Sequence, residues 1–118
     1  GLPDEALSIK TLINKYKSIQ HDFHSGIILP IGDEPSGKSW TGFQSLNGKK
    51  GYLLFFRENN PDKQGYVETW FEEGTKISCK PVLGNGKKVK KTIGRKGVIE
   101  IELPRINDFV LYEYTIIK

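Results

Sequence analysis

The segment Gly32–Ser39, GDEPSGKS, matches the phosphate-binding pattern G-x-x-x-x-G-K-[ST] at every fixed position. In that motif, the N–H groups of a glycine-rich turn and of a following helix hold the phosphates of a nucleotide. Here the next residues, SWTGFQSLNGKKG, are typical of a strand and a turn. Asp33 and Glu34 would also place two negative charges beside the phosphates. We therefore expect a surface loop that binds no nucleotide.

Few other residues suit metal binding or nucleophilic chemistry. His21 and His24 lie three residues apart, but no further ligand is apparent, so we predict no metal site. Cys79, the single cysteine, lies in the strand-like segment KISCKPV. We expect it to be a buried apolar side chain, because a catalytic thiol needs an activating histidine beside it. We assign no catalytic residue and no cofactor.

Paired carboxylates, which general acid–base catalysis requires, occur three times in the sequence. Glu100 and Glu102 alternate with apolar residues in VIEIEL, which is typical of a strand with one face in water. We therefore favour a solvated strand face over a catalytic pair at this position. The three pairs are Asp33/Glu34, Glu72/Glu73 and Glu100/Glu102.

A cluster of basic side chains falls within residues 80–96, where the sequence has no acid. Such a cluster could bind the phosphates of a nucleic acid while nearby aromatic rings stack on its bases. The segment has no aromatic residue, however, and lysines also protect sheet edges against pairing with other chains. We favour an edge hairpin over a nucleic-acid site. This basic patch comprises Lys80, Lys87, Lys88, Lys90, Lys91, Arg95 and Lys96.

Three aromatic residues are candidates for contact with carbohydrate, because an aromatic face can stack on a sugar ring. They are Trp40, Trp70 and Tyr66. Core packing is the alternative for each of them, since large aromatic side chains bury much apolar surface. The alternation in YVETWF does not decide between these two interpretations.

The composition and length are those of a globular domain. The chain has 118 residues, 36% hydrophobic and 27% charged, with a net charge of +4. This length suits one domain with a substantial core. No segment approaches the ~20 apolar residues of a membrane span, so we expect no membrane partner. In residues 4–20, apolar side chains recur at helical spacing, which predicts an amphipathic helix.

After Ser25-Gly26 the pattern changes to short apolar or alternating segments separated by turn residues. Asn-Gly pairs at 47–48 and 85–86 suit tight hairpins. Closely spaced strands without intervening helices predict an antiparallel β-sandwich, so we expect a mainly β fold. We assign residues 1–25 to the helix and its connection, and residues 26–118 to the sandwich. The expected strands are 27–31, 39–46, 51–57, 65–71, 76–82, 87–93, 98–103 and 109–117.

The order of these segments is itself informative. The helical segment ends in YKSIQHDFHSG, and ILPIGDEPSGKSWTGFQS then places a tryptophan eight residues after a Pro-Ile-Gly turn. GYLLFFRE ends an apolar strand in Phe-Arg, and FVLYEYTI forms a closing strand. Together these segments resemble the C-terminal end of α-galactosidase-like glycoside hydrolases, retaining enzymes with a (β/α)8 barrel. The motifs are most specific over Gly26–Arg57.

The resemblance implies an accessory role. In that family the last barrel helix leads into an antiparallel sandwich that packs against the barrel, and the two catalytic aspartates lie on barrel strands. No position here matches those aspartates, so none is carried over. The sequence has no methionine, in keeping with a C-terminal piece of a longer enzyme. Two alternatives are a free-standing carbohydrate-binding module and a nucleic-acid-binding β-barrel.

Overall fold

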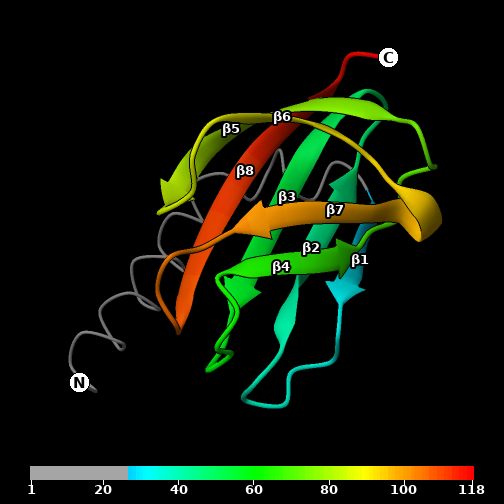
Figure 1. The fold of residues 1–118 in the computed structure, drawn as a ribbon. Helices are drawn as coiled ribbons and strands as arrows, with labels where there is room; N and C mark the ends of the chain where they lie inside the picture. Colours follow the sequence, from blue (N-terminus) through cyan, green and yellow to red (C-terminus); the bar gives the residue numbers. More distant parts are fainter. Residues whose placement is uncertain (1–26) are drawn as a thin grey trace.

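The computed structural model describes residues 27–118, so the predicted helix 4–20 and the predicted segment 1–25 lie outside the described residues. Within this range the chain is mainly β, with eight strands in antiparallel sheets, as the sequence predicts (Figure 1). The strands are β1 (Ile27–Gly32), β2 (Trp40–Leu46), β3 (Lys50–Arg57), β4 (Gln64–Glu68), β5 (Lys76–Gly84), β6 (Val89–Thr92), β7 (Val98–Glu102) and β8 (Asp108–Ile116). A single 3-10 turn, η1 (Arg95–Gly97), connects β6 to β7.

Six strands form the large sheet in the order β1-β2-β3-β8-β5-β6. The first three form a meander, and β8 then inserts between β3 and β5, so the last strand lies in the middle of the sheet. The remaining two strands, β4 and β7, pair with each other and cross in front of the large sheet (Figure 1).

The core lies between the two sheets. Every second residue of β3 points toward the small sheet, so Leu53 and Phe55 are fully buried. They join Val67 of β4 and Ile99 and Ile101 of β7 in one apolar cluster. We call this side of the large sheet its inner face. The opposite side is its outer face, and no strand of residues 27–118 covers it.

Local sequence explains two irregular features of the sheet. A two-residue turn joins β2 to β3, as predicted, but its residues are Gly48 and Lys49 and not the Asn-Gly pair, because the reciprocal main-chain hydrogen bonds join Asn47 and Lys50 and only Gly48 has a positive φ, +66°. Pro81 lies within β5, where a bulge shifts the register to β8 before Leu83. Because β6 pairs only with the segment 76–79, the missing N–H of Pro81 costs no ladder bond on that side.

Candidate functional site

The loop Gly32–Ser39, which matches the phosphate-binding motif, does form an anion-binding turn, which we call the cradle. The carboxylate bound there belongs to the protein itself. Glu58, the residue directly after β3, accepts hydrogen bonds from the N–H groups of Ser36, Gly37 and Ser39 at 3.0–3.1 Å. Gly37 has φ +89°, a conformation that glycine adopts without strain. A turn of this kind directs successive N–H groups to one point, where they bind a negative charge.

The chain that follows the loop is strand β2, as the sequence predicts, and not the helix of a nucleotide-binding loop. Further hydrogen bonds hold the loop in place, since the Asn60 side chain donates to Lys38 O at 2.9 Å. Ser39 Oγ also donates to Glu34 O at 2.8 Å. Glu58 lies outside the eight-residue motif, so inspection of the motif alone could not find it.

Trp40 is a core residue, so its prediction as a residue in contact with sugar is wrong and core packing is correct. Its side chain is 6% exposed and belongs to the apolar cluster between the sheets. The ring lies against Gly65 of β4, and its Nε1 donates to Asp62 O at 3.2 Å. Trp40 is buried because it begins the inward-facing series of β2, which continues through Gly42 and Gln44.

Trp70 and Tyr66 lie on the surface, where they could contact a ligand. They are 58% and 67% exposed. Tyr66 is an outward-facing residue of β4, and Trp70 lies two residues beyond the end of that strand. Trp70 Nε1 donates to Pro30 O of β1 at 2.7 Å, so its ring connects the small sheet to the edge of the large one. The Trp70 main-chain N–H donates to the fully buried Gln44 at 2.9 Å.

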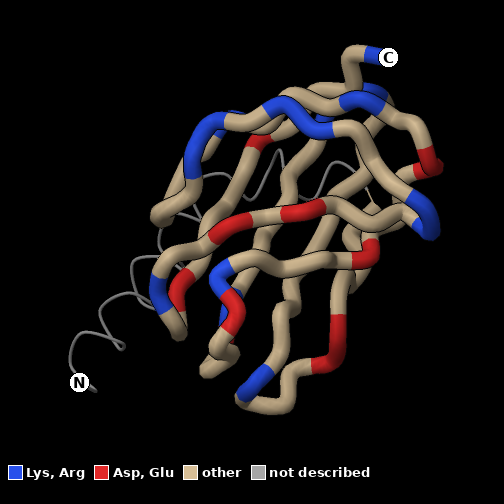
Figure 2. Tube along the Cα trace, viewed as in Figure 1, with Lys and Arg blue, Asp and Glu red and all other residues tan. Residues whose placement is uncertain are grey.

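The side chains of the basic patch do not all point the same way. Lys88 and Lys90 point away from the small sheet, whereas Lys87 and Lys91 line a cleft beneath β6. Arg95 and Lys96 lie at the β6–β7 turn, and the basic residues follow one edge of the molecule (Figure 2). β6 is a short edge strand, as predicted from its lysines. The acidic residues of β7 lie across from it (Figure 2).

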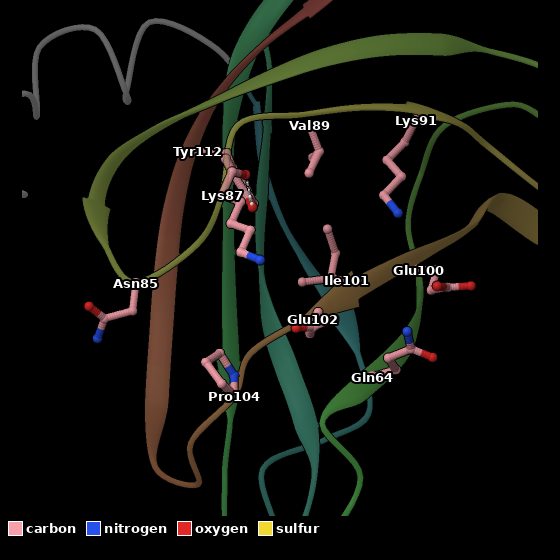
Figure 3. Close-up of a pocket in the computed structure, with 10 residues that line it drawn as sticks. All are labelled: Gln64, Asn85, Lys87, Val89, Lys91, Glu100, Ile101, Glu102, Pro104 and Tyr112. Carbon is pink, nitrogen blue, oxygen red and sulfur yellow. Dashed lines mark hydrogen bonds between the residues drawn. The ribbon is translucent and has the colours of Figure 1, made fainter.

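A cleft of about 170 Å³ separates β6 from β7 (Figure 3). Lys87 and Lys91 line it from the β6 side, and Glu100 and Glu102 line it from β7. Val89 and the buried side chains of Ile101 and Tyr112 contribute apolar surface. Glu100 and Glu102 are exposed while Ile99, Ile101 and Leu103 are buried, so the predicted half-solvated strand is confirmed.

The outer face of the large sheet carries a continuous apolar row. Cross-strand partners place one apolar residue from each of five strands side by side. Phe43 is 47% exposed, Leu54 and Leu83 are half-buried, and Leu111 is 2% exposed. In the adjacent row, Phe56 and Phe109 stack with their ring centroids 6.4 Å apart. The apolar row consists of Pro30, Phe43, Leu54, Leu111 and Leu83.

Three buried groups have raised pKa values. Burial in the core raises the pKa of Cys79 from 9.0 to about 12, and nearby Lys91 partly opposes the shift. Burial also raises the pKa values of Tyr112 and Tyr114 from 10.0 to about 12. Cys79 is fully buried, as the sequence predicts, and its raised pKa keeps the thiol protonated and unreactive at neutral pH.

Within residues 27–118, no group of three or more His, Cys, Asp or Glu side chains is placed to hold a metal ion. His21 and His24 lie outside the described residues. In the same part of the chain, no helix has the length and apolar content needed to cross a membrane.

Comparison with known proteins gives no match to any protein-family profile, curated protein or solved structure.

Proposed function

We propose that this chain is a non-catalytic accessory β-sandwich domain, preceded by a helix, of an α-galactosidase-like glycoside hydrolase. Its role is to pack against and stabilise the catalytic (β/α)8 barrel through the outer face of the large sheet. The apolar row Pro30, Phe43, Leu54, Leu111 and Leu83 is the observation that carries this proposal. It spans five strands, which is roughly 19 Å at the usual strand spacing.

The chemistry of this face indicates what kind of surface would cover it. Contiguous apolar side chains that reach the surface commonly mark sites of contact with another protein or domain. In this row Pro30 and Phe43 are exposed and Leu54 and Leu83 are half-buried, whereas Leu111 is buried. Toward β5 and β6 the same face becomes basic, because Lys80 and Lys90 point outward there. A complementary partner would present an apolar surface with acidic residues at its β6 end.

The experiment begins with the coding sequence upstream of Gly1, where we expect a segment long enough for a barrel. That segment is expressed separately and titrated with the chain by calorimetry. Phe43→Asp should weaken association at least tenfold, because it puts a charge into the apolar row that the contact would bury. Tyr66→Asp is the matched control, since Tyr66 is exposed on the small sheet, on the opposite side of the molecule. Equal effects of both variants, or no association, would reject the proposal.

The same samples test the assignment of catalysis to the barrel. Retaining hydrolysis needs two carboxyl groups about 5–5.5 Å apart across the scissile bond. We expect aryl α-galactosides to be hydrolysed by the assembled protein and not by this chain alone. Turnover by the chain, abolished by an alanine substitution of one of its own acids, would show that the chemistry lies here.

A further inference from the structure

The cleft between β6 and β7 is formed by two consecutive strands that separate from a common turn. Gly94 N donates to Val98 O at 2.8 Å and closes the narrow end. Beyond this bond, no ladder pairs β6 with β7 in residues 27–118. Lys87, Lys91, Glu100 and Glu102 surround the wider part of the cleft (Figure 3).

Strand register shows that β7 turns unpaired main-chain groups toward this cleft. Leu103 N donates to Lys63 O and Thr69 N to Gly97 O, so the bonded pairs of β4 and β7 fall at every second position between them. The N–H and C=O groups of Glu100 and Glu102 consequently point away from β4. In β6, Ile93 N donates to Thr75 O, so the bonded pairs of β5 and β6 also fall at every second position. The N–H and C=O groups of Lys90 therefore point away from β5.

The side chains add donors and acceptors of both signs. Lys87 and Lys91 face the cleft with ammonium donors, and Glu100 and Glu102 with carboxylate acceptors. Gln64 contributes an amide that can donate and accept, whereas the Asn85 amide donates to the Asp108 carboxylate. A polyanion would be repelled by one wall and a polycation by the other, so the mixed charge favours a ligand without net charge.

The base of the cleft is fixed and partly apolar. Tyr112 Oη donates to Lys87 O at 2.6 Å, which attaches the β6 side of the cleft to a buried residue of β8. Val89 and Ile101 offer apolar contact. Tyr66 is the cross-strand partner of Glu100, with Cβ atoms roughly 4.5–5.5 Å apart in such pairs, so an exposed ring lies next to the cleft.

We propose that this cleft binds a neutral, hydroxyl-rich ligand, one saccharide unit at a time. Each hydroxyl of a sugar can donate to a carboxylate or C=O group and accept from an ammonium or N–H group, and the cleft offers all of these. Its volume of about 170 Å³ equals that of roughly five or six water molecules, which suits one sugar ring and is too small for an extended peptide.

The residues that line the cleft are not those of the apolar row, so sugar binding here does not depend on docking to a barrel. It also replaces Trp40, which is buried, with a site built from β6, β7 and the neighbouring Tyr66. A ligand of one sugar ring should bind weakly, with a Kd on the order of 1 mM.

The test uses the full chain labelled with ¹⁵N and titrated with galactose, glucose and mannose up to 50 mM. We expect saturable shifts of the amide signals of Gln64, Lys91, Glu100 and Glu102 with at least one sugar. Glycine and inorganic phosphate, titrated in the same way, should not produce them.

Paired substitutions separate the cleft from general charge effects. The double variant Lys91→Gln, Glu102→Gln should raise the Kd at least fivefold. The control Lys80→Gln, Glu113→Gln changes the same charges at a cross-strand pair on the outer face and should leave the Kd unchanged. All four residues are at least partly exposed, and unchanged spectra elsewhere would show that the variants fold. Absence of saturable shifts, shifts centred on Trp70, equal effects of both doubles, or tighter binding of glycine or phosphate would each overturn the proposal.

Discussion

The ring of Trp40 rests on the α-carbon of Gly65, so closely that a Cβ at residue 65 would lie 2.2 Å from Trp40 Cδ2. This contact joins β2 of the large sheet to β4 of the small one. No L side chain fits at residue 65 unless the indole moves. Because Trp40 is buried in the core cluster, that movement would disturb the packing of both sheets.

Gly65→Ala should therefore lower the free energy of unfolding by about 1–3 kcal/mol, the usual cost of overpacking a core. Urea denaturation measures the effect. Gly94→Ala is the matched control, since a Cβ there would meet only Val98 O at 3.5 Å, and Gly94 has φ −86°. Equal midpoints for Gly65→Ala and the native chain would contradict this account of the contact.

Removing the carboxylate of Glu58 should release the loop 33–39. Glu58→Ala loses three hydrogen bonds from main-chain N–H groups, and we expect a loss of about 1–2 kcal/mol because the site is partly exposed. Glu73→Ala, an exposed acid without these bonds, is the control. Urea midpoints give the comparison.

The emptied cradle should also acquire affinity for small anions. Inorganic phosphate should raise the melting temperature of Glu58→Ala more than that of the native chain, because only the variant has free N–H groups. The native chain should give no specific heat when titrated with ATP and magnesium. Micromolar ATP binding by the native chain would refute our interpretation of the loop.

Alkaline pH should destabilise the fold. The pKa of Cys79 is about 12 in the folded chain against 9.0 in the unfolded one, so above pH 9 only the unfolded state loses the proton. Stability is unaffected at neutral pH and falls above pH 9 by up to about 1.4 kcal/mol per pH unit from this group. Tyr112 and Tyr114 add the same effect above pH 10. Urea midpoints from pH 8 to 11 measure the decline, which Cys79→Ala should make shallower.

The basic patch should attract nucleic acid weakly and without sequence preference. For a single-stranded DNA we expect a Kd no tighter than about 10⁻⁴ M at physiological salt, as in non-specific binding. Lys88→Gln, Lys90→Gln should reduce the slope of log K against log salt by about 1.4, since each phosphate contact of a single strand contributes about 0.7. Tight binding that survives physiological salt and prefers one sequence would favour a nucleic-acid function.

The strands could be predicted because their signals are local. Alternation in VIEIEL reports which side chains face the core, and the Asn47-Gly48 pair predicts a hairpin between strands that are neighbours in sequence, although the turn residues are Gly48 and Lys49. The order of the large sheet could not be predicted in this way. The pairing of β3 with β8 joins residues about sixty positions apart, and nothing local specifies it.

The candidate sites could not be predicted from local sequence signals either. Trp40 and Trp70 are the same residue type, yet Trp40 begins the inward-facing series of β2 and is buried, whereas Trp70 lies just beyond β4 and is exposed. The cleft combines Lys87 and Lys91 with Glu100 and Glu102 only because two strands separate after a turn. Glu58 occupies the cradle of a loop some twenty residues earlier in the chain. Each of these facts depends on tertiary packing.

The central position of β8 has a consequence for synthesis on the ribosome. β1–β3 and β5–β6 belong to one sheet only through β8, which pairs with β3 on one side and β5 on the other. Until residues 108–116 have emerged, both groups expose an unpaired, apolar strand edge. A nascent chain is therefore most prone to aggregation just before these residues appear. A premature stop before Asp108 should yield an insoluble product rather than a smaller stable domain.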